Sequence, residues 1–303
     1  MLNRLNIMRE VLKGVNLHGM GDYTFEQIAG RIKSEYAKAK TYLHNLTHPE
    51  DVKTAPPVTW ITPGGQKWAI YDDMSAQPHL LVSGTTGSGK SVVINGIVHA
   101  ILHRAPCQAQ LILIDPKRVE LVQFRSLPHT ISYASEPWNI IEALNHAIRI
   151  TEARYSAMQR TGEKMYTGPD LYVLIDELAD LLTTNRKAIQ PLLQRLCQIG
   201  RAARVHVIAG TQCPLASILS TPIKVNFDAR VGLRTRSAQD SRNILGMKGC
   251  ETLPRYGIGY YMKPEGTALY QLPMVSQEEL TELCQYWQSD KCKVIKEDQS
   301  NEH

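Results

Sequence analysis

A glycine-rich run in the first third of the chain has the composition of a phosphate-binding loop. Residues 84–91 read GTTGSGKS and match the pattern GxxxxGK[ST]. Glycines let successive backbone N–H groups curl around phosphates, and a following helix adds its dipole. Lys90 is expected to neutralise the β- and γ-phosphates, and the Ser91 hydroxyl to ligate Mg²⁺. The predicted ATP-binding residues are Gly84, Thr85, Thr86, Gly87, Ser88, Gly89, Lys90, Ser91 and Val92.

A second pattern places two carboxylates at the end of an apolar run. Residues 171–177 read LYVLIDE, as a buried strand does when it delivers acids to its carboxyl edge. Asp176 is expected to hold the Mg²⁺, and Glu177 to accept a proton from the attacking water as a general base. The alternative is a carboxylate pair that only caps a helix, which the nearby phosphate loop disfavours.

A further polar pair follows the apolar run at residues 205–209. Thr211 and Gln212 come directly after Gly210, next in chain order after the acidic strand. Gln212 is therefore a candidate for sensing the γ-phosphate or orienting the attacking water. The alternative is that Thr211 and Gln212 only begin a turn.

These polar residues fall at the ends of short apolar runs that alternate with helical patterns. Such continuous apolar strands separated by helices predict an α/β fold, with a mostly parallel sheet covered by helices on both faces. The strand–loop–helix order around residues 79–103 also argues against a chance match of the glycine-rich run. The expected strands are 79–83, 110–114, 171–175, 205–209 and 229–233, and the expected helices are 91–103, 138–159 and 187–204.

The two ends of the chain differ from this alternating region. Residues 1–48 carry a capping box and a helical apolar stripe, so they are expected to form helices that pack on the core or dock on a partner. The polar and proline-containing stretch that follows reads as a linker. We therefore divide the chain into a helical N-terminal region with linker (1–57), an α/β domain (58–289) and a flexible polar tail (290–303).

Composition excludes several classes of protein. The chain has 303 residues, 43% of them hydrophobic, and no run of 18 apolar residues that would predict a membrane span. The first residues lack the apolar block of a signal peptide. The six cysteines form no CxxC pair and have neither zinc-site nor disulfide spacing, so a reduced, cytoplasmic location is expected.

Positive charge is concentrated in one region, although the net charge of the chain is only +5. Between Arg186 and Arg242 there are ten basic residues, opposed by Asp228 and Asp240 alone. Such a local excess suits a polyanion, either DNA or nucleotide phosphate. The alternative is an ordinary solvated surface with scattered arginines.

Several motifs in order give the chain a family resemblance. Residues 78–91 (PHLLVSGTTGSGKS), 114–121 (IDPKRVEL), 173–180 (VLIDELAD) and 240–245 (DSRNIL), together with Arg201-Ala-Ala-Arg-Val-His206 and Gly210-Thr-Gln212, resemble the motifs of the FtsK/SpoIIIE family of DNA translocases. The resemblance extends over about residues 60–289. It implies a RecA-like P-loop motor domain that assembles as a homo-hexameric ring on double-stranded DNA and is driven by ATP.

The resemblance also suggests roles for two arginines. Arg201 occupies the position of the family's arginine finger, which acts on the nucleotide of a neighbouring subunit. A guanidinium supplied in this way stabilises charge on the transferring phosphoryl group. Arg242 is a second candidate, and a structural ion pair is the alternative for either residue.

The chain departs from the family pattern near the expected pore. Cys213 stands where the family has arginine, and Arg204 where it has glycine. Lys224 is the one basic residue in the segment 213–224. Lys224 and Arg204 are therefore the candidate DNA contacts.

The family's membrane-spanning and winged-helix domains have no counterpart in this sequence. This favours a compact motor for a plasmid, an integrative element or a phage over one for chromosome segregation. Two other functions stay open: a virion DNA-packaging ATPase, and a nucleotide-switched adaptor that binds DNA or a relaxase without processive movement.

Overall fold

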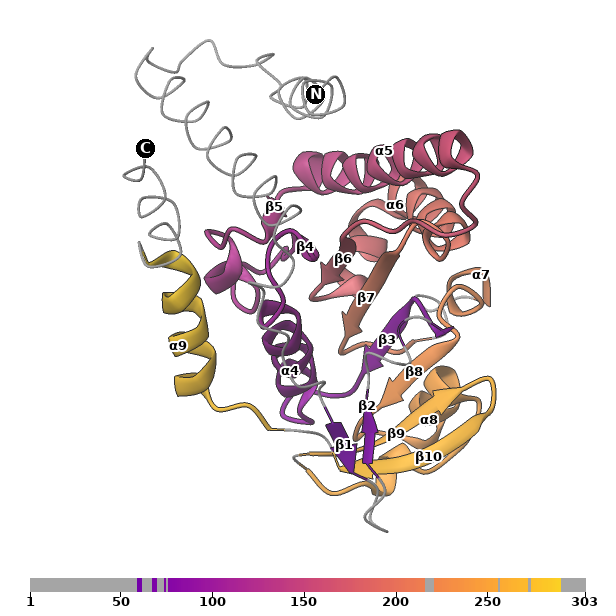
Figure 1. Cartoon of the computed structure of the whole chain (residues 1–303). Helices are drawn as coiled ribbons and strands as arrows, with labels where there is room; N and C mark the ends of the chain where they lie inside the picture. Colours follow the sequence, from indigo (N-terminus) through magenta and orange to yellow (C-terminus); the bar gives the residue numbers. More distant parts are fainter. Residues whose placement is uncertain are drawn as a thin grey trace.

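The computed structural model describes residues 59–61, 67–69, 74, 76–215, 221–255, 257–271 and 274–289. The predicted N-terminal helical region and linker, and the predicted polar tail from residue 290, lie outside these residues. The described part is built on one mixed sheet, coloured along the chain in Figure 1.

The sheet contains ten strands in the order β2-β1-β10-β9-β8-β3-β7-β6-β4-β5 among the described residues. The six strands from β8 to β5 are parallel, and the sequence analysis predicts all of them except β5. The strands are β1 (Thr59–Ile61), β2 (Lys67–Ala69), β3 (Leu80–Ser83), β4 (Ala109–Ile114), β5 (Thr130–Ala134), β6 (Asp170–Ile175), β7 (Val205–Thr211), β8 (Ala229–Gly232), β9 (Ile258–Lys263) and β10 (Gly266–Gln271).

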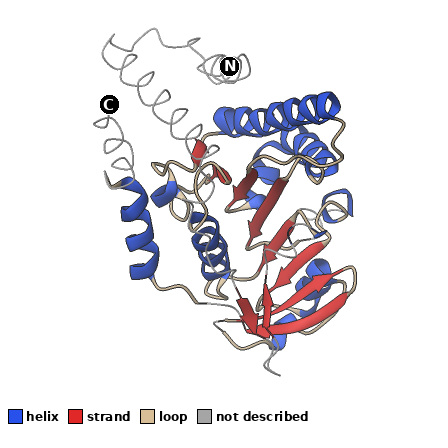
Figure 2. Ribbon diagram, in the orientation of Figure 1, coloured by secondary structure: helices blue, strands red, loops and turns tan. Residues whose placement is uncertain are grey.

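The helices cover both faces of the parallel strands, as Figure 2 shows. Side chains of α4 and α9 pack on one face, and side chains of α5 and α6 pack on the other. Adjacent residues of a strand point to opposite faces, so Leu80 and Val82 belong to the first core and Leu81 to the second. The helices are α4 (Lys90–Leu102), α5 (Pro137–Thr161), α6 (Leu178–Gly200), α7 (Thr221–Lys224), α8 (Ala238–Leu245) and α9 (Gln277–Gln288), with 3-10 turns at Val122–Phe124 and Cys250–Thr252.

The five expected strands and the first two expected helices are confirmed to within two residues at each end. The long helix α5 carries Thr151 on its buried side, where the Thr151 hydroxyl donates to the Ala147 carbonyl at 2.7 Å. This bond satisfies the hydroxyl within the helix.

The third expected helix begins in the wrong place. The sequence pattern predicts it over 187–204, but α6 begins at Leu178, directly after the acidic strand. The helix is kinked at Asn185, whose φ and ψ are −148° and 57°. The kink interrupts the helical period, so the sequence pattern marks only the part after it.

The antiparallel half of the sheet is not expected from the sequence. Strands β9 and β10 form a hairpin beside β8, and β1 and β2 add to its outer edge. No helix among the described residues is long and apolar enough to cross a membrane.

Candidate active site

The glycine-rich run forms the loop between β3 and α4, at the carboxyl edge of the parallel strands. The loop is tied to two other strands, because the Gly84 N–H donates to the Thr211 carbonyl at 3.2 Å and the Thr85 N–H to the Arg234 carbonyl at 3.0 Å. Within the loop, the Ser88 N–H donates to the Thr85 carbonyl at 3.0 Å. These bonds fix the loop to the end of β7 and to the residues that follow β8.

The glycines of this loop are required by its geometry. Gly87 and Gly89 have φ values of +74° and +104°, which side chains rarely tolerate. A Cβ on Gly84 would lie 2.4 Å from Ser88 Oγ and 2.6 Å from Leu233 Cβ. Gly89 is also the N-cap of α4, so the backbone turns there into a helix N-terminus that favours anions.

Lys90 is the first residue of α4 and lies almost entirely inside the protein. Its Nζ donates to Asp176 Oδ1 at 2.6 Å and to the Asp176 carbonyl at 2.7 Å. Gly210 permits this approach, since a Cβ there would lie 2.4 Å from the Asp176 carbonyl oxygen. The structure thus joins the lysine of the loop to the first acid of the predicted acidic strand.

Glu177 is the N-cap of α6 and is 2% exposed. Its two carboxylate oxygens each lie 3.1 Å from the backbone nitrogen of Gln212, which donates to them, and Oε1 also accepts from the Ala179 N–H at 3.4 Å. The end of β7 therefore holds the predicted general base directly.

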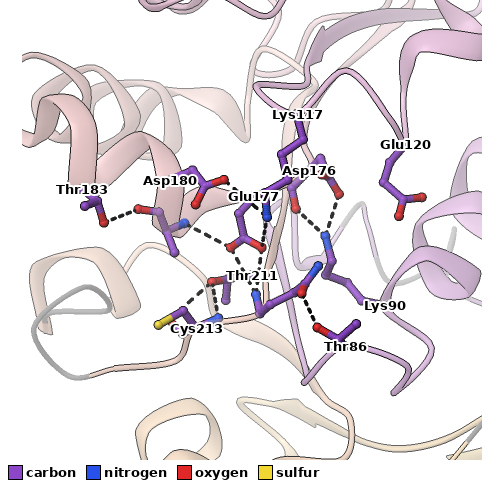
Figure 3. Close-up of polar contacts among 12 residues, drawn as sticks. Thr86, Lys90, Lys117, Glu120, Asp176, Glu177, Asp180, Thr183, Thr211 and Cys213 are labelled. Atoms are coloured by element: carbon purple, nitrogen blue, oxygen red, sulfur yellow. Dashed lines mark hydrogen bonds and ion pairs between the residues drawn. The ribbon is translucent and has the colours of Figure 1, made fainter.

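Gln212 connects the base to the phosphate loop. Its side-chain Oε1 accepts a hydrogen bond of 2.8 Å from the Thr86 hydroxyl, while its backbone holds Glu177. Gln212 therefore contacts both the phosphate loop and Glu177. The three predicted regions meet at one edge of the sheet, as Figure 3 shows.

Two further residues join this site to which the sequence analysis assigns no role, although both lie in the family-like run 114–121. Lys117 Nζ lies 3.6 Å from Glu177 Oε2 and 3.4 Å from Asp180 Oδ2. The Ser91 hydroxyl donates to Glu120 Oε1 at 2.7 Å. Both Lys117 and Glu120 follow β4, whose carboxyl end lies beside that of β6, and this position is the signal that could have pointed to them.

The two carboxylates raise the pKa of Lys117. Burial acts to lower it, but the negative charges of Glu177 and Asp180 outweigh that effect. Lys117 therefore stays protonated beside the base at neutral pH.

Residues 61–170 match the FtsK/SpoIIIE family. The chain carries an FtsK/SpoIIIE-family domain. It is 35% identical to the DNA translocase FtsK of Agrobacterium fabrum over 74% of this chain and 30% of that protein. It is also 35% identical to the DNA translocase SpoIIIE of Bacillus subtilis over 61% of this chain and 26% of that protein. The chain thus spans about a third or less of the length of these relatives.

Solved structures support the fold. The ATPγS-bound monomer form of the pCW3 conjugation coupling protein TcpA superposes with a TM-score of 0.65 at 20% identity, over 78% of this chain and 72% of that one. The cytoplasmic domain of the type VII secretion ATPase EccC of Thermomonospora curvata gives a TM-score of 0.65 at 22% identity, over 78% and 31%. The FtsK/SpoIIIE-family domain is therefore a P-loop α/β fold.

The phosphate loop of this domain fits a nucleoside triphosphate. Its two positive-φ glycines and the helix N-terminus suit an anion, and the Ser88 hydroxyl, which is buried, has no hydrogen-bond partner within the described residues. No group of three His, Cys, Asp or Glu side chains among those residues is placed to hold a metal ion. The Ser91 hydroxyl and the Asp176 carboxylate supply oxygen donors of the kind that Mg²⁺ takes, and Mg²⁺ typically completes its shell with phosphates and water.

Arg201 lies at the opposite edge of the sheet. Strand β7 starts four residues after Arg201 and reaches the phosphate loop only at its other end, about 20 Å away. Arg201 is exposed, and its guanidinium has no hydrogen-bond or ion-pair partner in the described part of the chain. Arg201 therefore cannot reach the phosphate loop of the same chain.

Arg204 lies at the same edge but is bound within the fold. Its guanidinium donates to both oxygens of Asp170, at 2.6 and 2.8 Å, and Arg104 and His206 also contact this carboxylate. Burial alone would raise the pKa of Asp170, but these bonds and charges hold it well below its usual range.

Lys224 ends the short helix α7. Its carbonyl accepts a 2.7 Å bond from Arg230 Nη2, whereas its ammonium has no hydrogen-bond or ion-pair partner within the described residues. Residues 216–220 of the expected pore segment lie outside those residues. Arg242, the second finger candidate, is exposed in the last turn of α8.

Proposed function

We propose that this chain hydrolyses ATP to move double-stranded DNA and works as a homo-hexameric ring in the transfer of a plasmid, an integrative element or a phage genome. The observation that carries the proposal is the meeting of Lys90, Asp176 and Glu177 beside the phosphate loop, in a chain 35% identical to named DNA translocases. Their names support DNA as the substrate here.

The arrangement supports a direct hydrolysis step. The oxygen of a water forms a bond to the γ-phosphorus, and the bond from that phosphorus to the β–γ bridging oxygen breaks, releasing ADP and phosphate. Glu177 accepts the proton of the water, and Gln212 holds Glu177 in place. Lys90 leaves Asp176 for the phosphates. Ser91 and Asp176 would hold Mg²⁺, which would supply positive charge beside the phosphate oxygens.

The position of Arg201 supports the ring. An exposed arginine on the edge opposite its own phosphate loop is suited to complete the site of a neighbouring copy. Six copies arranged head to tail would place six such arginines at six sites. A nucleotide-switched adaptor that binds a relaxase has less need of Glu177, since a switch does not require a strong base.

A DNA-stimulated ATPase assay combined with strand displacement tests this function. We expect linear duplex DNA to stimulate ATP hydrolysis and the protein to displace a third strand annealed to that duplex. The matched control is Glu177→Gln, which should bind ATP and DNA but displace nothing. Hydrolysis without displacement would favour the adaptor, and displacement only in the presence of a procapsid would favour a packaging ATPase.

A further inference from the structure

The segment Asp115–Leu121 reaches the active site from the end of β4. It forms a closed turn, because Asp115 Oδ2 accepts from the Leu121 N–H at 3.0 Å and the Asp115 carbonyl from the Arg118 N–H at 3.1 Å. Arg118 has a φ of +58°, which is uncommon for a residue with a side chain. The turn therefore holds Lys117 in a defined place.

Lys117 extends from this turn toward the start of α6. Its Nζ lies 3.6 Å from Glu177 Oε2 and 3.4 Å from Asp180 Oδ2, and Figure 3 shows it between the two carboxylates. It is the only cation that contacts Glu177 in the described part of the chain. Asp180 is 44% exposed whereas Glu177 is 2% exposed, so the same ammonium joins a surface carboxylate to a buried one.

Glu177 depends on few contacts for its orientation. One backbone amide, that of Gln212, bonds both of its oxygens, and the bond from Ala179 is long at 3.4 Å. The carboxylate of Asp176 precedes it in the chain, and that of Asp180 lies on the first turn of α6. Lys90 balances the charge of Asp176, and Lys117 is the cation that lies between the carboxylates of Glu177 and Asp180.

We propose that Lys117 is a positioning residue for ATP hydrolysis, whose ammonium holds the Glu177 carboxylate in the orientation from which it accepts the proton of the attacking water. Asp180 anchors the ammonium at the mouth of the site. Lys117 touches neither nucleotide nor water in this role and acts only through Glu177. The inference rests on the proposed hydrolysis but not on DNA movement.

The first experiment measures steady-state ATP hydrolysis without DNA in the full chain. Lys117→Met should lower kcat about 10- to 100-fold, because a small displacement of a catalytic group has effects of that size. The KM and the affinity for a non-hydrolysable ATP analogue should stay unchanged. Lys117→Arg should recover most of the rate, because it restores the cation.

Arg118→Met is the matched control. It removes the same charge one residue along the turn, from a side chain that is 60% exposed and pairs with Glu136. Its kcat should equal the parental value. An equal fall in kcat in Arg118→Met and Lys117→Met, or a weaker analogue affinity in Lys117→Met, would overturn the role of Lys117.

The second experiment compares Lys117→Met in two backgrounds by single-turnover hydrolysis. If Lys117 acts through Glu177, the substitution should slow the parental chain but cause no further decrease in Glu177→Gln. The same fold-decrease in both backgrounds would show a general structural effect and refute the inference. A chain that hydrolyses ATP with this pattern but displaces no strand from DNA would refute only the translocase proposal.

Discussion

The two edges of the parallel sheet both carry buried ion pairs, but the pairs differ in how completely each partner is held. At the carboxyl edge, Lys90 bonds Asp176, and the Ser91 hydroxyl bonds Glu120. In the proposed reaction, Lys90 would bind phosphate instead of Asp176, and the Ser91 hydroxyl would bind Mg²⁺ instead of Glu120. At the amino edge, the Asp170 carboxylate is bound by Arg204, Arg104 and His206 at once.

Burial of a charge therefore does not by itself indicate catalysis. The pKa of the Asp170 carboxyl is held far below its usual range, yet the fold supplies the partners that lower it. Arg201, at the same edge, is exposed and without a partner among the described residues. The proposed function thus uses the exchangeable pairs of one edge and the unpaired arginine of the other.

The largest expected effect on the hydrolysis rate concerns Arg201. In a ring, this residue would bring the amino edge of one copy to the phosphate loop of the next. Arg201→Ala should bind ATP normally but lower the hydrolysis rate of the assembled ring about 1,000-fold or more, because an arginine supplied in trans typically contributes that much. The rate is measured with DNA, and ATP affinity is measured by equilibrium binding.

Mixed rings provide the control for this assignment. Subunits with Arg201→Ala and subunits with Lys90→Ala should together recover some activity, because some interfaces then pair an intact finger with an intact phosphate loop. No recovery in rings shown to be mixed would contradict a role in trans, as would a chain that stays monomeric with ATP and DNA.

The next largest effect lies within the carboxyl edge. Glu177→Gln should keep ATP bound but lower hydrolysis about 100- to 10,000-fold, because the amide cannot accept the proton. Lys90→Ala should instead weaken ATP binding, because the phosphates lose their cation. Affinity and rate measured on the same two variants separate these effects, and a parental rate in Glu177→Gln would exclude it as the base.

The sequence predicts five of the six parallel strands because those five are buried on both faces. The residues in the middle of β5 are partly exposed, and the sequence analysis does not predict that strand. A run such as residues 171–175 is apolar throughout, and one polar loop follows each run. Strands β9 and β10 escape prediction because their residues are partly exposed and mix Gly and Tyr with Lys and Gln, so neither a continuous run nor a clean alternation marks them.

The candidate site also has one part that the sequence predicts and one part that it does not. Lys90, Asp176 and Glu177 could be brought together from sequence, because the ends of parallel strands meet at one edge. The contact of Lys117 with Glu177 could not be predicted, since it depends on a turn closed by Asp115 and on the unusual φ of Arg118. Nor does the positive charge of Arg204 reveal that Asp170 already binds it.

A smaller effect tests whether the amino edge is structural. Arg204→Ala should lower the free energy of unfolding by about 1–3 kcal/mol, because it leaves the buried Asp170 carboxylate with fewer donors. Arg195→Ala is the matched control. Its partner Glu152 is half exposed, so that pair should contribute under about 1 kcal/mol. Chemical denaturation of both variants measures the difference.

The pH dependence of the Arg204→Ala effect gives a second check. A lowered pKa in the folded state stabilises the protein above the unfolded pKa of Asp, and that stability is lost as the pH falls toward the folded value. The deficit of Arg204→Ala should therefore be largest at neutral pH and shrink below about pH 4. A deficit that stayed constant into acid would mean that Arg204 stabilises by packing alone.

The smallest expected effect concerns the proposed DNA contact. Because the Arg204 guanidinium is bound to Asp170 and the Lys224 ammonium has no described partner, the comparison of the two candidates favours Lys224. Lys224→Ala should weaken binding several-fold on every duplex and reduce the slope of log affinity against log salt by about 0.9 for each phosphate that the lysine no longer neutralises. DNA-stimulated hydrolysis should fall with it while basal hydrolysis stays unchanged.

The matched control for Lys224→Ala is Lys164→Ala, which removes an exposed lysine from the turn after α5. It should leave the salt slope at its parental value, because no DNA contact is proposed there. Both variants and Arg204→Ala are titrated at several salt concentrations, below the temperature at which Arg204→Ala unfolds. An unchanged slope in Lys224→Ala, with a reduced slope in Arg204→Ala, would assign the contact to Arg204. It would also mean that the ion pair with Asp170 opens when DNA binds, so the two edges would differ less than their contacts indicate.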